Sequence, residues 1–187
     1  MTGPQTGKAT TGDRPGEHPG PAGVASSFDG PAVTTALTAA GVSHVVWVPD
    51  SALGRWDAAL SSAAGLSLIR VCREGEAVGL AMGLHIGGAR PLVMMQCTGF
   101  FEAGDAIRNA VHDLKVPLFF LIGVRSWYAH RAGRTTDTCP VFVEPIVRAW
   151  QIPFSTLDPQ RDTPADLAAA YTAARQARRA GAVLLAE

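Results

Sequence analysis

Apolar and polar residues form blocks of two kinds along the chain. Short runs rich in Val, Ile, Leu and Met predict buried strands, and between them apolar residues recur every three or four positions, which predicts helices. The predicted strands are 44–48, 66–71, 91–96, 116–124, 154–156 and 182–186. The predicted helices are 32–40, 51–60, a glycine-rich helix from Glu74, 105–114, 140–150 and 164–180. This alternation predicts an α/β fold, a single three-layer domain whose mostly parallel sheet has about six strands.

Turn and capping residues divide these blocks. Asp29 before Gly30-Pro31 and Thr163 before Pro164 are typical helix starts, and Gly41 is a typical helix end. Residues 1–27 are instead dominated by Gly, Pro, Thr and Ala, without the apolar core of a secretion signal. We therefore expect a disordered tail over 1–27 and one folded domain over 28–187.

Composition limits the possible functions. The chain has 187 residues, of which 47% are hydrophobic, so it has room for one domain with a substantial core. Lys plus Arg and Asp plus Glu number 16 each, so no overall charge favours a nucleic-acid partner. The apolar runs are too short to span a membrane. The three cysteines are widely separated and lack zinc-like spacing, which favours a reduced, cytoplasmic setting and no metal site in this chain.

The glycine-rich helix carries the main candidate for chemistry. At helical spacing, Glu74 shares a face with Ala77, Val78, Ala81 and His85. A carboxylate on this small, apolar face would be partly desolvated, and its pKa would be raised. The alternative is a surface charge that stabilises a helix N-terminus. A stripe of glycines on the same helix indicates that another element packs very close to it; the stripe is Gly75, Gly79, Gly83 and Gly87.

Further candidates follow other predicted strands. Ligands of open parallel sheets bind at the carboxyl ends of strands, so the segments after residues 48, 71, 96 and 123 should meet at one edge. Pro49-Asp50 follows the first strand, although turn formation and helix capping explain this pair equally well. The loop 125–139 is long and contains Arg125 and Arg131, which could bind an anion or be simply solvated.

These motifs together resemble a known family. The Glu-Gly-x-Ala-Val-Gly-x-Ala-x-Gly segment from Glu74, with Pro49-Asp50 before it and Cys97-Thr98-Gly99 after it, resembles the pyrimidine-binding domain of thiamine-diphosphate enzymes. It is most similar to the α subunits of sulfopyruvate decarboxylase and the matching domain of phosphonopyruvate decarboxylase. The resemblance runs from about Asp29 to the C-terminus.

The resemblance implies roles for individual residues. Glu74 would hydrogen-bond N1′ of the cofactor's aminopyrimidine and favour the imino tautomer that removes the proton from thiazolium C2. Small residues would let the backbone approach the pyrimidine ring at Cys97, Thr98 and Gly99. Substrate would be contacted by Pro49, Asp50, Arg125 and Arg131. Some relatives carry histidine at the position of His85, yet a packed or solvated residue is the favoured interpretation.

The resemblance also implies a partner. Ligands for the diphosphate and for Mg²⁺ are expected on a separate diphosphate-binding, β-type subunit, since Gly104-Asp105-Ala106 lacks the spacing of the usual motif. The expected enzyme is a hetero-oligomeric thiamine-diphosphate-dependent decarboxylase of a small 2-oxo acid, with no nucleic-acid or membrane partner. An acetolactate-synthase-like carboligase subunit and a non-catalytic partner subunit are the alternatives.

Overall fold

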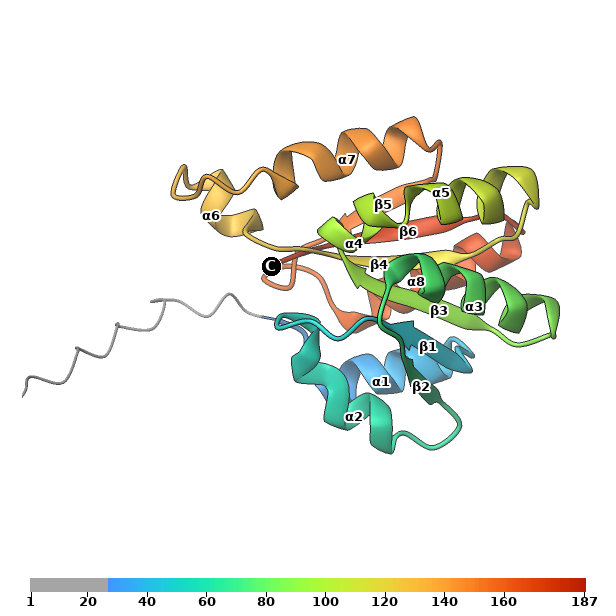
Figure 1. Ribbon diagram of the computed structural model, residues 1–187. Coiled ribbons are helices and arrows are strands. Elements are labelled where there is room, and N and C mark those ends of the chain that lie inside the picture. The colour runs from blue at the N-terminus through green and yellow to red at the C-terminus, as the bar shows by residue number, and fades with distance from the viewer. Residues whose placement is uncertain (1–26) are drawn as a thin grey trace, which may run out of the picture.

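A single six-stranded sheet organises the domain. The computed structural model describes residues 27–187, so the tail predicted over 1–27 lies, except for Ser27, outside the described residues. The strands are β1 (His44–Trp47), β2 (Ser67–Arg70), β3 (Pro91–Gln96), β4 (Phe119–Val124), β5 (Phe154–Leu157) and β6 (Gly181–Ala186). Their order is β2-β1-β3-β4-β6-β5, and every neighbouring pair is parallel (Figure 1). The predicted α/β class is confirmed, and the sheet is fully parallel.

Helices cover both faces of this sheet, as the three-layer prediction requires (Figure 1). One face carries α1 (Gly30–Ala39), the 3₁₀ helix η1 (Leu53–Trp56), α2 (Asp57–Ser62) and α8 (Pro164–Gln176). The other carries α3 (Glu74–Ile86), α4 (Cys97–Glu102), α5 (Gly104–Ile107), the π-helix η2 (Arg108–Asp113) and α7 (Cys139–Ala149). A short helix, α6 (Trp127–Arg131), follows β4.

The core consists of two apolar layers, one on each side of the sheet. Along β3, Leu92 and Met94 join the layer beneath α1 and α8, while Val93 and Met95 join the layer beneath α3 and α7. All four are at most 1% exposed. Because successive side chains of a strand point to opposite faces, a continuous apolar run is what a central strand covered on both faces requires.

The predicted helix boundaries rest on local contacts. The Asp29 carboxylate accepts a hydrogen bond from the Ala32 N–H (3.2 Å). Thr163 and Asp166 form a reciprocal capping box, with the Thr163 N–H donating to the Asp166 carboxylate (2.8 Å). Gly41 has φ +77°, the left-handed conformation that ends α1.

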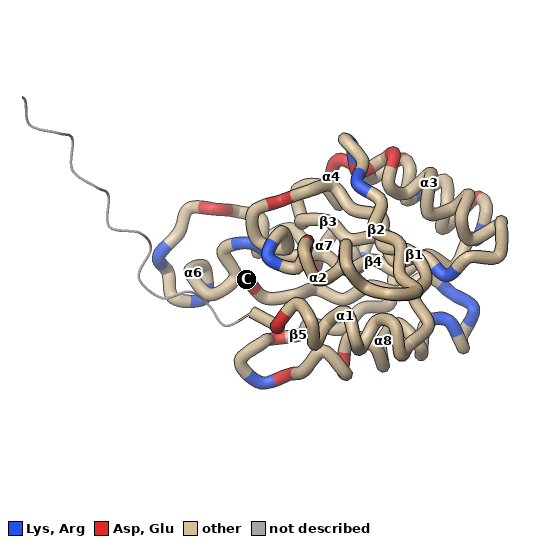
Figure 2. The backbone as a smooth tube through the Cα atoms, turned by 90° about the horizontal axis from the view of Figure 1, so that it is seen from below, with Lys and Arg blue, Asp and Glu red and all other residues tan. Residues whose placement is uncertain are grey.

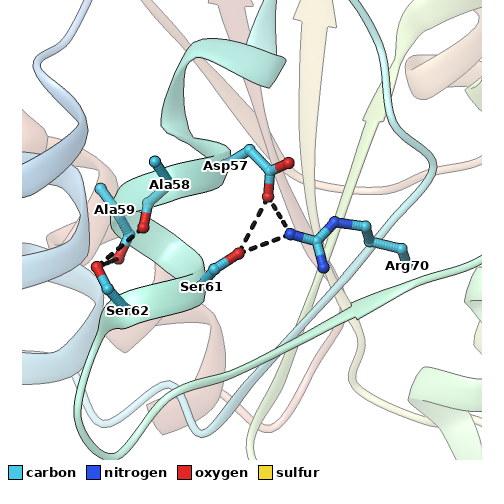
Figure 3. A network of polar contacts seen from close by, with 6 residues as sticks. All are labelled: Asp57, Ala58, Ala59, Ser61, Ser62 and Arg70. Carbon is cyan, nitrogen blue, oxygen red and sulfur yellow. Dashed lines mark hydrogen bonds and ion pairs between the residues drawn. The ribbon is translucent and has the colours of Figure 1, made fainter.

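The segment 66–71, predicted as a buried strand, is an edge strand that is only partly buried. Ser67 and Arg70 of β2 are exposed, because β2 lies at one end of the strand order. Arg70 forms an ion pair with Asp57 and donates a hydrogen bond to the Ser61 hydroxyl (2.6 Å), both on α2 (Figure 3). These contacts tie the edge strand to the helix beside it.

Two predicted loops contain helix. Cys97-Thr98-Gly99 forms the first turn of α4 rather than a loop, since the helix begins directly after β3. The long segment 125–139 contains α6, whose Tyr128 hydroxyl donates a hydrogen bond to the Asp158 carboxylate (2.6 Å). The segments that follow β3 and β4 are therefore more helical than the sequence indicates.

Candidate active site

The parallel sheet gathers the candidate residues at one edge. The carboxyl ends of β1, β2, β3, β4 and β6 all point the same way. Asp50 follows β1, Glu74 begins the helix after β2, Gly99 lies on the helix after β3, Arg125 follows β4 and Glu187 follows β6. The predicted convergence of the strand ends is confirmed, and this edge is where open parallel sheets bind ligands.

Glu74 and Gly99 are in direct contact at this edge. Glu74 is the first residue of α3, and its half-buried side chain lies against the backbone of Gly99. A Cβ atom added at position 99 would lie only 2.5 Å from Glu74 Cδ. Within residues 27–187, no group forms a hydrogen bond or ion pair with the Glu74 carboxylate. The Gly99 backbone therefore limits the movement of the Glu74 carboxyl group on one side. The two oxygens of that group stay free to bind a ligand.

A second carboxylate fixes the start of α3. Glu102 of α4 forms an ion pair with Arg73 and accepts a hydrogen bond from the Gly75 N–H (3.3 Å). The Arg73 hydrogen bond lowers the pKa of Glu102. Glu76 accepts a hydrogen bond from the Cys72 N–H (3.2 Å), which ties the first turn of α3 to the segment before it. Sequence reasoning missed Glu102, and a carboxylate three residues after Gly99 was its only signal.

The buried face of α3 is the one predicted. His85, near the other end of this helix, lies too far from Glu74 to belong to the same site. Ala77, Val78 and Ala81 are at most 1% exposed. His85 lies 11 positions after Glu74, which corresponds to about 16 Å along a helix. Burial, followed by the charge of Arg175, lowers the pKa of His85. His85 is therefore associated with the opposite edge of the sheet.

The glycine stripe of α3 is left largely uncovered by residues 27–187. Apart from the adjacent residues and nearby backbone of α3 itself, no heavy atom of the described residues lies within 4 Å of a Cβ built on Gly79 or Gly83, although Ala106 lies 3.8 Å from one built on Gly75. Nearby on the same helix, Leu80 and Ile86 are 36% and 71% exposed. The close packing predicted from the stripe is thus absent within residues 27–187.

Asp50 is tied into the turn after β1. Its carboxylate accepts hydrogen bonds from the N–H groups of Ala52 and Leu53 (2.8 Å each) and from Trp47 Nε1 (3.0 Å). Pro49 beside it is exposed. The capping role considered for Asp50 is present, and the same bonds hold its carboxylate rigidly at the carboxyl edge.

The two candidate arginines differ in their contacts. Arg125 forms an ion pair with Asp137 (Nε to Oδ2, 2.9 Å), and this charge raises the arginine's pKa. Arg131 is exposed and lies over the Trp127 ring, 6.0 Å from its centroid. Asp137 therefore partly neutralises Arg125, whereas Arg131 has no ion-pair partner among residues 27–187.

The predicted cofactor segment 97–99 combines three environments. Cys97 is fully buried, and burial together with the neighbouring Cys139 raises the pKa of its thiol to about 12. Thr98 is exposed, and Gly99 is buried against Glu74. Cys97 is a packed, protonated thiol, so the parts of this turn that a ligand could approach are Thr98 and the backbone.

Glu187 is a carboxyl group at this edge that sequence reasoning missed. Gly123 of β4 leaves room for it, since a Cβ there would lie 2.8 Å from Glu187 Oε1. Among residues 27–187, Glu187 Oε2 is buried without a hydrogen-bond partner. Burial, followed by the charge of Asp50, raises the pKa of Glu187 to about 8. A carboxylate directly after a buried parallel strand was the available signal.

Protonation of Glu187 should make stability depend on pH. Because its pKa is raised in the folded state, the domain should lose stability as the pH rises from about 4.5 to about 8, by at most about 1.4 kcal/mol for each pH unit. Glu187→Gln removes this titration, so its advantage over the parent chain should grow over the same interval. Urea unfolding of both chains from pH 5 to pH 9 measures the difference, and parallel profiles would contradict the prediction.

The fold and site together define a three-layer α/β domain that presents a carboxyl group at the ligand edge of a parallel sheet. Residues 30–139 match the family described as thiamine pyrophosphate enzyme, N-terminal TPP binding domain. This match covers more than half of the chain, and the chain belongs to that family.

Three similar proteins extend this comparison. The chain is 31% identical over 94 residues to sulfopyruvate decarboxylase subunit alpha of Methanococcus maripaludis, an alignment covering 50% of this chain and 56% of that protein. A putative thiamin diphosphate-dependent enzyme from Mycobacterium smegmatis superposes with a TM-score of 0.62 at 18% identity, over 86% of this chain and 30% of that one. Benzoylformate decarboxylase from Polynucleobacter necessarius superposes with a TM-score of 0.57 at 13% identity, over 83% of this chain and 32% of that one. The two superpositions show the same fold.

Each of these similar proteins is longer than the part that this chain matches. The chain matches about half the length of its curated relative and about a third of each solved structure. Within residues 27–187, no helix is both long and apolar enough to cross a membrane.

Proposed function

We propose that this chain is the pyrimidine-binding subunit of a heteromeric, thiamine-diphosphate-dependent 2-oxo acid decarboxylase. The contact between Glu74 and Gly99 carries the proposal. It combines a half-buried carboxyl group that has no partner in the described chain with a backbone position where a side chain would not fit. A planar ring that binds by one edge nitrogen needs both features, so these residues fit an aminopyrimidine.

Glu74 then acts on a single proton. When bound, thiamine diphosphate supplies the carbon centre that accepts the electron pair released as carbon dioxide leaves a 2-oxo acid. Glu74 shares a proton with N1′ of the aminopyrimidine, and Thr98 and the backbone around Gly99 border the ring. Glu102 keeps the Glu74 end of α3 in place through Arg73 and Gly75.

A second chain completes the site in this proposal. One relative is a subunit alpha, and the chain matches only 30% of the putative thiamin diphosphate-dependent enzyme from Mycobacterium smegmatis; both observations favour a separate diphosphate-binding subunit that also holds Mg²⁺. The open glycine stripe of α3, with Leu80 and Ile86 beside it, is a suitable surface for that subunit. Gly79 and Gly83 would let a helix of the partner approach the α3 backbone closely.

Substrate binding is proposed for the surrounding turns. Pro49 and Asp50 border the ligand edge after β1, and Arg125 and Arg131 are two of the arginines in the segment after β4. Arg131, which lacks an ion-pair partner among residues 27–187, is suited to bind a sulfonate, phosphonate or carboxylate group. The exposed Cys72 and the two buried cysteines are all free thiols, in keeping with a proposed cytoplasmic location.

Isothermal titration of the purified chain with thiamine diphosphate and Mg²⁺ tests the two-chain proposal. We expect little binding and no decarboxylation by the chain alone, because the diphosphate ligands belong to the partner. Both should appear when the diphosphate-binding subunit is added, and Arg131→Ala should then raise the Michaelis constant for a sulfonated 2-oxo acid more than for pyruvate. Tight cofactor binding by the chain alone would contradict the proposal.

The reconstituted enzyme also separates the two alternatives. A carboligase would transfer the bound fragment to a second carbonyl compound, so its product would be a hydroxyketone rather than an aldehyde. A non-catalytic subunit would tolerate the loss of the Glu74 carboxyl group. Product analysis and the Glu74 variant described in the Discussion distinguish all three functions.

A further inference from the structure

Basic residues gather at the edge of the sheet opposite the candidate active site. Segments that carry Lys and Arg cluster at the right-hand end of the domain in Figure 2, away from the C-terminus. Two cavities lie among the connections that enter β3, β4, β5 and β6. The first, of about 290 Å³, is lined in part by His112, Lys115, Arg178 and Arg179. The second, of about 430 Å³, is lined by His85, Lys115, Pro117, Arg175 and Arg178.

The positive charge of these cavities is not balanced by carboxylates. No Asp or Glu of the part of the chain that the structure describes lines either cavity. The ion pairs formed within residues 27–187 include none of the four cations Lys115, Arg175, Arg178 and Arg179. Arg175 does lie over the Tyr171 ring, 6.0 Å from its centroid, but a ring face leaves the charge in place. The lowered pKa of His85 reflects burial and the charge of Arg175.

Backbone geometry provides an independent observation. Lys115, Gln151 and Arg178 all line the first cavity, and their φ angles are 55°, 51° and 52°. This left-handed conformation follows a helix end in each case, where glycine is the favoured residue. Residues with a Cβ atom are strained there, and such strain tends to occur at functional sites. Three long polar side chains thus replace glycine around one cavity.

Helix capping alone does not account for the whole charge. The C-terminal ends of η2, α7 and α8 reach this edge, and each carries roughly half a negative charge at most. Four cations exceed that partial charge, so the cavities keep a positive potential. The chain as a whole is neutral, with 16 basic and 16 acidic residues, which disfavours the extended basic surface that a nucleic acid requires.

From these observations we infer that the two cavities form a binding site for a small anion that carries a chain of at least three phosphate groups. Lys115 and Arg178 line both cavities and bind the central part of the ligand. Arg175 binds one end and Arg179 the other, which is the arrangement that a linear chain of phosphates matches. The site lies at the amino edge of the sheet, away from Glu74, and it stands whether or not the proposed decarboxylase function holds.

Isothermal titration of the purified chain with inorganic triphosphate tests the inference. We expect saturable binding to one site, weakened by added salt. Lys115→Gln and Arg178→Gln should each weaken it by about tenfold or more, as expected for loss of a hydrogen bond between charged groups. Arg134→Gln is the matched control. It removes the same charge from an exposed arginine that lies outside both cavities, so it should leave triphosphate binding unchanged.

A glycine variant separates binding from helix capping. Arg178→Gly should weaken triphosphate binding by about tenfold or more, as Arg178→Gln does, while the melting temperature holds or rises, because glycine relieves the left-handed strain. The inference is overturned if the chain does not bind triphosphate, if Arg134→Gln weakens binding as much as Arg178→Gln, or if Arg178→Gly changes the melting temperature but not the affinity. Preferential capture of single-stranded RNA or anionic vesicles, with no triphosphate binding, would also overturn it.

Discussion

Glu74→Gln should slow proton exchange at C2 of the bound cofactor by about a hundredfold or more, the usual effect of removing a positioned acid-base group. An amide cannot share a proton with N1′ in the way that a carboxyl group does. The substituted side chain has nearly the same size, so its packing against Gly99 and the fold should be preserved. Hydrogen-deuterium exchange at C2 in the complex with the partner subunit, together with single-turnover decarboxylation, measures the effect.

Glu76→Gln is the matched control on the same helix. Glu76 contacts only the Cys72 N–H among the polar groups of residues 27–187, so its loss should alter the turn slightly and leave exchange nearly unchanged. If Glu74→Gln exchanges C2 as fast as the parent chain, or if Glu76→Gln is the slower of the two, Glu74 is only a helix-terminal charge. That outcome would favour the non-catalytic alternative.

Gly99→Ala should displace the Glu74 carboxyl group and lower both stability and activity. The new Cβ would overlap Glu74, and overpacking of this kind costs about 1–3 kcal/mol. Gly99 lies in α4, where alanine is intrinsically favoured over glycine by about 1 kcal/mol, so a net loss of stability would show that the contact dominates. A displacement of about 1 Å at a catalytic group can reduce the rate about a hundredfold.

Gly79→Ala provides the comparison that isolates the contact. No other element of the described chain lies within 4 Å of a Cβ at position 79, so in the isolated domain the substitution should raise the free energy of unfolding by up to about 1 kcal/mol. Urea unfolding of both variants shows whether each substitution raises or lowers the free energy of unfolding. Equal stabilisation by Gly99→Ala and Gly79→Ala would show that Glu74 moves aside without cost, and the rigid arrangement proposed for the active site would then be wrong.

The sequence by itself determined the fold class and the place of the site. Apolar runs with no alternation predicted strands covered on both faces, and β3 and β4 are buried in this way because helices pack on each side. The alternation of strands and helices fixed a parallel sheet, and parallel strands bring their carboxyl ends to one edge. Glu74 could be predicted there because a single carboxylate interrupts a helix face of small apolar residues.

Only the tertiary structure decided which side chains meet. Whether Gly99 merely permits a turn or leaves space for Glu74 depends on how α4 packs against α3, and positions 25 residues apart carry no local signal of that contact. The edge position of β2, which exposes Ser67 and Arg70, depends on strand order and not on the composition of the strand.

The same limit applies to the charged groups. Burial, followed by the charge of Asp50, raises the pKa of Glu187, and Gly123 leaves room for its side chain; Asp50 and Gly123 are both distant from it in the sequence. The basic cavities combine the ends of α3, η2 and α8, whose cations are scattered through a chain of zero net charge. Periodicity determines how each segment folds and which face it buries, because those are local properties, whereas the pairing of charges across the domain exists only once the layers have packed.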